Sequence, residues 1–483
     1  MSIYLLIITP FILALVLLLG GVRRRAIELL AIIGGAIELA SAIAIIFFGG
    51  RHEQSIFSPL LSFDALGSWF LLITSVLGFF ALLYSVSYLR REEKRQEISD
   101  NKLARYYALF HLFLLTMFVA VGANNVLLLW IAVEATTLCS AFLVNFFDRP
   151  AAIEAAWKYM IINTVALLLG LFGIFLFIGA VQHASLATIS LDWKSITAVA
   201  HLLDVPLIKL AFVFMLVGYG TKAGLAPLHN WLPDAHSQAP SPVSAMLSGA
   251  LLNVALLALL RFKGVIDIAA GPTYSQMLFL VFGTGSILVA AMLILIQKQY
   301  KRLLAYSSVE HMGIIIFGLG VGGVGSVAAL LHALYHSLAK SMLFLSSGNI
   351  VLRYHALEIG KVRGLLRTLP VTGVLFLAGL LAVAGVPPFG TFMTELVIFS
   401  AAFTAHPFFT TIALLALAIA FVGIMRHISA MCFGKKEEGM QGGEDGDILG
   451  ILPIIVLFAL LILLSLCQPT ILVTLLHEAA LNF

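Results

Sequence analysis

Apolar runs of about 18 to 28 residues dominate the chain. Each run is long enough to cross, as a helix, the roughly 30 Å of hydrocarbon in a bilayer. None shows the ten-residue alternation of a membrane β-barrel. The pattern therefore predicts one all-α integral membrane domain over 1–483 with about fourteen transmembrane helices, at approximately 2–22, 26–49, 63–89, 104–122, 124–147, 155–181, 205–225, 240–262, 275–297, 301–322, 325–352, 370–401, 408–433 and 448–475.

Composition supports a membrane protein over soluble domains. Hydrophobic residues make up 61% and charged residues 11% of the chain, and the mean hydropathy is +1.06. So few charges cannot cover several water-soluble globules, and the net charge of +4 is spread over short loops, which argues against a nucleic-acid binder. Cys139, Cys432 and Cys467 form no CxxC pair. We therefore expect no redox centre, cofactor or disulfide framework in this chain.

Basic residues fall mainly on one side of the predicted helices. Loops after odd-numbered helices hold 19 of the 28 lysines and arginines, and loops after even-numbered helices hold five. Since short basic loops stay in the cytoplasm, both termini are predicted to lie outside it, as in an inner (plasma) membrane protein. The remaining four basic residues fall within helices or at helix ends: Lys158, Lys222, Lys340 and Arg426.

Two predicted helices contain Gly/Pro interruptions. Lys222–Pro227 interrupts the seventh helix and Gly385–Gly390 the twelfth, and proline should break both. Breaks at corresponding places in two halves are typical of inverted-repeat transporters. The spacing of charged residues pairs 104–262 with 275–434 as first and second repeats.

Charges inside spans are costly, so each is a candidate functional residue. Glu134 lies in an apolar stretch of the fifth helix, and Lys222 lies at the break of the seventh. The two side chains could form an ion pair that takes part in proton transfer. A static pair that only fixes helix packing is the alternative.

Histidines form a second cluster of candidates. His332, His336 and Lys340 are spaced at i, i+4 and i+8, so they share one helix face, and His311 lies on the preceding helix. Histidine titrates near neutrality, which suits a proton relay. His332 and His336 have zinc-like spacing, but they lack a third ligand and an HExxH glutamate, so we assign no metal site.

Other intramembrane polar residues carry weaker hypotheses. Glu395, just beyond the second break, could exchange protons with outside water or could face a neighbouring polypeptide. Arg426 is either its partner or a snorkelling residue, and Lys158 is equally a relay or a snorkelling residue. Glu38 and His111 could each bond a neighbouring helix or subunit.

Three segments carry a specific resemblance: TKAGLAPLHNWLPDAHSQAPSPVSAMLSGALLNVALLALLRF, KRLLAYSSVEHMGIIIFGLG and AGVPPFGTFMTELVIF. They resemble the proton-pumping antiporter-like subunits of respiratory complex I and of multisubunit cation/proton antiporters, over about residues 60–435. SSVEHMGI and HSLAKSMLFLSSGNI are most similar to hydrogenase-4 component F of membrane-bound group 4 nickel–iron (NiFe) hydrogenases and formate hydrogenlyases.

The resemblance implies fourteen helices with two inverted five-helix repeats, each containing a broken helix. It implies that Glu134 and Lys222 gate proton movement, that His311 and His336 lie on a central polar axis, and that Glu395 is its terminal ionisable residue. The sequence departs from the family at Asn253, where a helix-eight lysine is usual. Asparagine holds water but carries no proton at neutral pH, so the relay must cross this point through water or be modified.

These observations predict a proton-translocating subunit of an energy-converting redox complex of the hydrogenase-4 kind. Expected partners are other membrane subunits, the lipid bilayer, protons or Na⁺, and, through those subunits, a peripheral arm with NiFe and iron–sulfur subunits; nucleic acid is not expected. Two alternatives stay open. One is a subunit of a Na⁺/H⁺ antiporter complex, and the other is a non-conducting structural subunit of the membrane arm, which Asn253 would favour.

Overall fold

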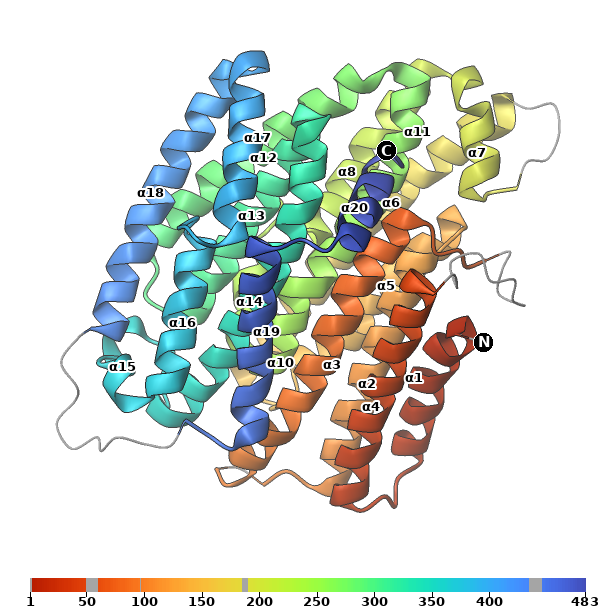
Figure 1. The fold of residues 1–483 in the computed structure, drawn as a ribbon. Helices are drawn as coiled ribbons and strands as arrows, with labels where there is room; N and C mark the ends of the chain where they lie inside the picture. The colour runs from red at the N-terminus through yellow and green to blue at the C-terminus, as the bar shows by residue number, and fades with distance from the viewer. Residues whose placement is uncertain (1, 49–59, 96, 185–189, 434–444) are drawn as a thin grey trace.

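The long apolar runs form a bundle of helices that lie side by side (Figure 1). The computed structural model describes residues 2–48, 60–95, 97–184, 190–433 and 445–483. Over these residues, thirteen helices are long and apolar enough to span a membrane: α1 (Ser2–Leu19), α2 (Arg24–Phe47), α3 (Ala65–Glu93), α4 (Asp100–Gly122), α5 (Val126–Val144), α6 (Pro150–Ala184), α8 (Val205–Lys222), α10 with α11 (Ser241–Ala270), α12 (Pro272–Ile296), α13 (Tyr300–Val321), α14 (Val324–Tyr354), α18 (Pro407–Cys432) and α19 (Ile448–Leu466). The predicted all-α membrane fold is confirmed.

Shorter helices complete the described part of the chain: α7 (Trp193–Val199), α9 (Trp231–Gln238), α15 (Leu365–Thr368), α16 (Pro370–Val383), α17 (Gly390–Ala405) and α20 (Thr470–Ala480). α16 and α17 each fall short of a membrane thickness, and counting them as one broken span is what gives fourteen. That count stays a prediction. The single run predicted over 448–475 is wrong, because α19 ends at Leu466 and Pro469 separates it from α20.

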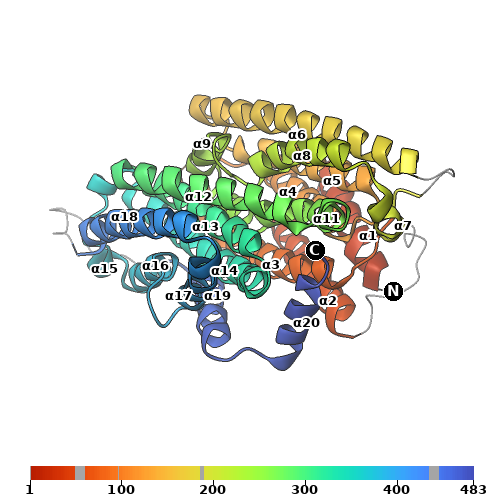
Figure 2. The same ribbon diagram turned by 90° about the horizontal axis from the view of Figure 1, so that it is seen from above.

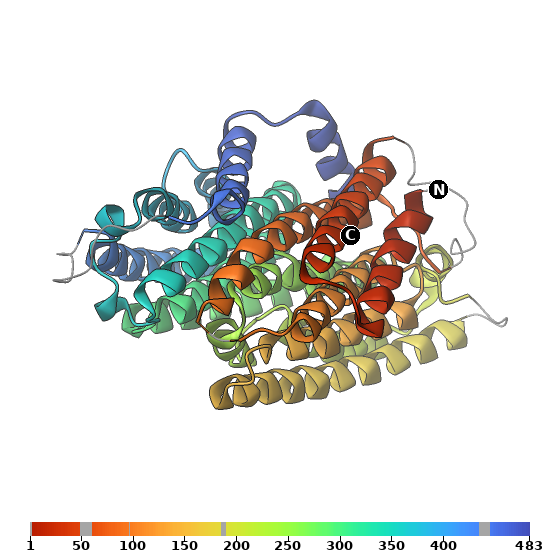
Figure 3. The same cartoon turned by 90° about the horizontal axis from the view of Figure 1, so that it is seen from below.

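Burial divides the helices into a centre and a periphery. The most apolar stretch of α10–α11 is entirely buried, and those of α13 and α14 are 94% and 89% buried, against 28% for α1 and α19. Seen from above and from below, α6 lies along one edge and α19 and α20 at the opposite edge (Figures 2 and 3). Polar side chains on α11, α13 and α14 are therefore enclosed by protein.

Both predicted breaks are confirmed, and they share one local conformation. α8 ends at Lys222 and α16 at Val383, and two residues later Gly224 and Gly385 adopt φ of 79° and 65°. These left-handed values are accessible to glycine at little cost. In each break the residue after the glycine donates its N–H to the carbonyl five residues back, at 2.8 Å from Leu225 and 3.1 Å from Val386. Each helix therefore ends in the same tight turn.

The α12–α13 pair has a seam in which the two backbones touch. A Cβ atom on Gly283 would lie 2.7 Å from the Phe317 nitrogen, and one on Gly313 would lie 3.0 Å from the Gly283 carbonyl oxygen. Real side chains do not fit at such distances. Small residues at helix crossings allow this close approach, which is how membrane helices gain van der Waals contact.

Candidate functional site

Buried polar side chains form a row across the bundle. Its members come from five helices, and most of their side chains are fully buried. From the α8 side to the α17 side they are Lys222, Asn253, Lys340, His336, His311, His332 and Glu395. Every one of these residues was a candidate from the sequence, and the structure brings them into one region.

Lys222 is the last residue of α8, completely buried at the break. Its ammonium donates hydrogen bonds to Thr137 Oγ1 and to Tyr159 OH, each at 2.8 Å, and lies 4.8 Å from the centre of the Tyr159 ring. The carbonyl end of a helix carries partial negative charge, which favours a cation there. Lys222 is therefore held by neutral hydroxyls and a helix end.

Glu134 does not pair directly with Lys222. Its Oε1 accepts a hydrogen bond from Thr164 Oγ1 at 2.7 Å, while Oε2 has no hydrogen-bond partner among the described residues. No ion pair within 4.0 Å joins the two groups in this part of the chain, so the contact pair suggested by the sequence is corrected. The ammonium is turned toward Thr137 and Tyr159, which occupy its donor directions.

Asn253 lies just beyond a π-helical turn, Leu247–Leu251, that joins α10 to α11. Its amide nitrogen donates to the Gly249 carbonyl at 2.8 Å and to Ser337 Oγ on α14 at 2.7 Å. Its Oδ1 is buried with no partner among the described residues. A buried amide oxygen in this state is a point where water can be held.

Lys340 and Glu310 form the second charged position. Lys340 is fully buried on α14 and donates to the Leu304 carbonyl at 2.9 Å. Glu310, on α13, is 3% exposed, and its Oε2 has no partner in the described residues. Glu310 was not among the site residues predicted from the sequence. Its position immediately before His311 was the available signal.

His311 and His332 meet edge to edge between α13 and α14. His311 Nδ1 lies 2.9 Å from His332 Nε2, and their ring centres are 5.1 Å apart. The outer nitrogens are also engaged, since His311 Nε2 lies 3.0 Å from the Val383 carbonyl and His332 Nδ1 lies 2.7 Å from Thr394 Oγ1. The pair thus links α13 and α14 to the second broken helix.

Three further histidines, His229, His236 and His336, are buried with both ring nitrogens unpartnered among the described residues. His336 has its ring centre 5.2 Å from that of His311. His236, on α9, stacks on Phe344 of α14 at 4.7 Å. Sequence reasoning missed His236, which lies in the PDAH segment of the first broken helix. Unpaired buried nitrogens of this kind normally bind water.

Glu395 ends the row on α17. It is partly exposed and lines a groove of about 600 Å³ between α17 and α18, beside the turn that follows α16, and the other walls are mainly apolar side chains such as Phe399 and Phe421. Its carboxylate also fits against Gly385, where an added Cβ would lie 2.4 Å from Oε2. Glu395 therefore has one side toward the histidines and one toward the groove.

The weaker candidates lie apart from the row. Lys158 is half exposed on α6 and pairs with Glu154 at 2.6 Å and Asp234 at 3.6 Å. Arg426 is exposed on α18. Glu38 and His111 bond each other at 2.8 Å between α2 and α4, with both side chains buried. That bond joins two helices of this chain.

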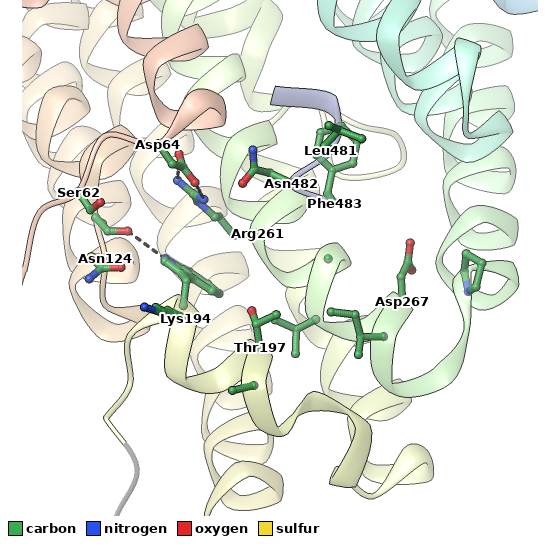
Figure 4. Close-up of a pocket in the computed structure, with 17 residues that line it drawn as sticks. Ser62, Asp64, Asn124, Lys194, Thr197, Arg261, Asp267, Leu481, Asn482 and Phe483 are labelled. Atoms are coloured by element: carbon green, nitrogen blue, oxygen red, sulfur yellow. Dashed lines mark hydrogen bonds and ion pairs between the residues drawn. The ribbon is translucent and has the colours of Figure 1, made fainter. Parts of the chain in front are cut away.

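Polar pockets lie at the two ends of α3. At its start, a pocket of about 890 Å³ contains the Asp64–Arg261 ion pair beside Lys194 and Phe483 (Figure 4). Near its other end, a pocket of about 500 Å³ contains Glu92, and Lys301, which donates to the Ala239 carbonyl at 3.1 Å. The second pocket lies on the side of the basic loops that flank α3 and α14.

A multi-pass membrane protein with a buried row of ionisable groups between two broken helices is thus the class that the fold and site define. The family described as NADH:quinone oxidoreductase/Mrp antiporter, transmembrane, matches residues 123–420, and the chain belongs to this family. The chain is 38% identical over 379 residues to a hydrogenase-4 component F homolog of Methylacidiphilum infernorum, covering 77% of this chain and 79% of the relative. It is 29% identical to hydrogenase-4 component B of Escherichia coli, covering 93% and 69%.

Solved structures share the fold. A chain of the archaeal membrane-bound sulfane sulfur reductase superposes with a TM-score of 0.86 at 23% identity, with 100% of this chain and 96% of that chain covered. A chain of the Mrp complex from Dietzia gives 0.85 at 22% identity, with 100% and 97% covered. This protein is therefore an antiporter-like membrane subunit of the complex I, hydrogenase-4 and Mrp family. The predicted family is confirmed.

Proposed function

We propose that this chain translocates protons as a subunit of a redox-driven membrane complex of the hydrogenase-4 kind. The observation that carries the proposal is the row of buried ionisable groups from Lys222 to Glu395. A structural subunit has no need for fully buried lysines and histidines, because each costs free energy at membrane depth. The relatives named hydrogenase-4 components support a redox complex. We propose that its peripheral arm contains NiFe and iron–sulfur subunits.

The proposed route starts on the side of the basic loops, taken as the cytoplasm of a cell inner membrane with both termini outside it. Protons enter through the pocket beside Lys301 and reach Lys340 and Glu310. They pass by way of His336, His311 and His332 to Glu395 and leave through its groove. Lys222, with Glu134 nearby on α5, connects to this half through water held at Asn253.

The two halves are proposed to be inverted repeats over 104–262 and 275–434. The matching turns at Gly224 and Gly385 support this relation. They also set a register in which Lys222 corresponds to Val383. In the proposed mechanism, a change of charge near Glu134 moves the Lys222 ammonium between its hydroxyl partners and the water route.

Exchange of Na⁺ for H⁺ without redox input is the second candidate function. The similarity in fold to a chain of the Mrp complex favours it. The relatives at higher identity are named hydrogenase-4 components, so the redox-driven function has the stronger support. Driving the purified complex with redox substrates at fixed Na⁺ separates the two, since an exchanger needs no electron transfer.

The proposal is tested by following the pH gradient that the purified whole complex forms in sealed liposomes when its redox substrates are added. Glu395→Gln keeps the shape of the side chain but cannot carry the charge, and we expect the initial rate of gradient formation to fall on the order of 100-fold, at the lower edge of the effects of positioned proton-transfer groups. A full gradient in a well-assembled Glu395→Gln complex would place the protons in another subunit. Loss of assembly in this isosteric variant would favour a structural subunit.

Asn253→Leu tests the water connection. Leucine matches asparagine in size but has no oxygen to hold water, so transfer that depends on Lys222 should fall while the helix packs as before. We expect the pH gradient to drop about tenfold with normal amounts of assembled complex, measured by gel filtration. An unaffected gradient would mean that the Lys222 half and the Lys340 half work independently.

A further inference from the structure

Three metal-ligating side chains converge where α13, α14 and α17 meet. One ring nitrogen from each of His311 and His332 and one carboxylate oxygen of Glu395 all lie within 4.8 Å of one another. His311 and His332 are 21 positions apart in the sequence, and Glu395 follows 63 positions after His332, so no short sequence motif contains all three. Two imidazoles and one glutamate are a ligand set that proteins use for Zn²⁺.

The hydrogen bonds around the histidines aim bare nitrogens at this point. His311 Nε2 faces the Val383 carbonyl oxygen, which only accepts, so Nε2 carries the hydrogen and Nδ1 is an unprotonated acceptor. Thr394 Oγ1 lies 3.0 Å and 2.9 Å from the carbonyls of Gly390 and Thr391, to which it donates. It then accepts from His332 Nδ1. In this arrangement His332 Nε2 is also bare, 2.9 Å from His311 Nδ1.

In the tautomer in which both facing nitrogens are bare, the two lone pairs need a cation between them, which can be a proton or a metal ion. In the other tautomer, His332 Nε2–H donates to His311 Nδ1, and a bound metal ion would displace that hydrogen. The outer contacts match those of known zinc histidines, whose second N–H is fixed by a carbonyl or another acceptor. Zinc–nitrogen bonds of about 2.0–2.1 Å place ligand atoms roughly 3.3 Å apart, so the histidines must separate by only a few tenths of an ångström.

Glu395 supplies both the third ligand and the access route. It is partly exposed to the 600 Å³ groove between α17 and α18, so one of the three ligands is accessible from outside the buried row. Its side chain is long enough to move the carboxylate about 1.5 Å toward them. The groove also leaves room for a water as a fourth ligand, as in open tetrahedral zinc sites.

We propose that His311, His332 and Glu395 form a site for a divalent transition-metal ion, with Zn²⁺ as its best-fitting occupant. The bound ion would occupy the space between the two histidines and the carboxylate. A bound ion would also inhibit proton translocation, because it would occupy the place through which protons pass from His332 to Glu395. This consequence rests on the proposed function. Metal binding itself does not depend on that function.

The first experiment measures binding directly. The purified whole complex in metal-free detergent buffer is titrated with Zn²⁺ against a competing chelator dye, and bound zinc is counted by elemental analysis after gel filtration. We expect one site in the wild type that is lost, or weakened at least about tenfold, in His332→Gln and in Glu395→Gln. Thr394→Val keeps all three ligands but loses the acceptor for His332, and it should weaken binding by about 10- to 100-fold.

His201→Gln is the matched control, because His201 is exposed between α7 and α8 and lies outside the cluster. It should bind Zn²⁺ like the wild type. Melting curves check that each variant is folded, and Zn²⁺ should raise the melting temperature of the wild type and of His201→Gln but not of His332→Gln. Equal zinc content, affinity and melting shift in all proteins would overturn the site.

The pH-gradient assay separates failure of this site from failure of the proposed function. Zinc binding that is lost in His332→Gln, without any effect of Zn²⁺ on the gradient, would confirm the metal site and reject a proton route through it. Conversely, a gradient that depends on Glu395 in a wild type that binds no Zn²⁺ would support the route and reject the metal site.

Discussion

Replacing Lys222 with alanine is expected to abolish redox-driven proton translocation while the complex still assembles. The side chain is fully buried and its ammonium is held by two hydroxyls, so it can release and regain a proton without moving a partner charge. Removing it takes a titratable group out of the proposed route, and we expect the pH gradient in liposomes to fall on the order of 100-fold or more.

Assembly should survive because one partner of Lys222 keeps another bond. Tyr159 OH also bonds Ser140 Oγ at 2.6 Å, so this hydroxyl is not left unpaired by the change. Lys222→Met, which fills the volume, should lose translocation equally. Lys209→Ala, on the same helix but near its other end, is the matched control and should pump normally. Wild-type translocation in assembled Lys222→Met would refute the role given to Lys222.

Gly283→Leu is expected to destabilise the protein strongly. The added side chain would begin with a Cβ atom 2.7 Å from the Phe317 nitrogen and 2.9 Å from the Gly313 carbonyl oxygen. Both are backbone atoms, so α12 and α13 must move apart. Overpacking of this kind costs about 1–3 kcal/mol or more, and the broad contact between these helices leaves little room to relax. The melting temperature of the purified protein in detergent should fall, with less assembled complex in the membrane.

Gly285→Leu provides the control for this prediction. Gly285 lies two residues further along α12, on a different side of the helix, and nothing lies within 4 Å of a Cβ built there. Both variants replace a glycine of α12 with leucine, so the difference in helix propensity between the two residue types cancels in the comparison. Equal melting temperatures for the two variants would mean that the α12–α13 seam contributes little to stability.

Much of the fold followed from apolar length alone, because a bilayer requires each span to be a long apolar helix. The two breaks were also visible, since proline and glycine act locally at Pro227 and Pro388. The end of α19 was missed, because apolar residues continue beyond Pro469 and hydropathy averages over the interruption. Which glycines form seams was not visible either, as Gly283 and Gly285 differ only in what lies across from them.

The site was predictable as a set of residues and not as a set of contacts. A charge such as Lys222 stands out because it is costly in an apolar segment. What it bonds depends on rotamers and on neighbouring helices, which is why the expected Glu134 partner proved to be Thr137 and Tyr159. Glu310 and His236 were overlooked because their segments are polar enough that a single ionisable residue does not stand out.

The π-helical turn at Leu247–Leu251 sets the rotational phase of α11. Each residue rotates an α-helix by about 100° about its axis. A π turn contains one additional residue, so the residues after it are rotated relative to an uninterrupted α-helix. Asn253 faces Ser337 on α14 only with that residue taken up upstream. If the turn tightened to an α-turn, the whole of α11 would rotate by roughly a quarter turn relative to α10, and its amide would face another neighbour. The contact of Asn253 with Ser337, which connects the two halves of the row, therefore depends on the conformation of this one helical turn.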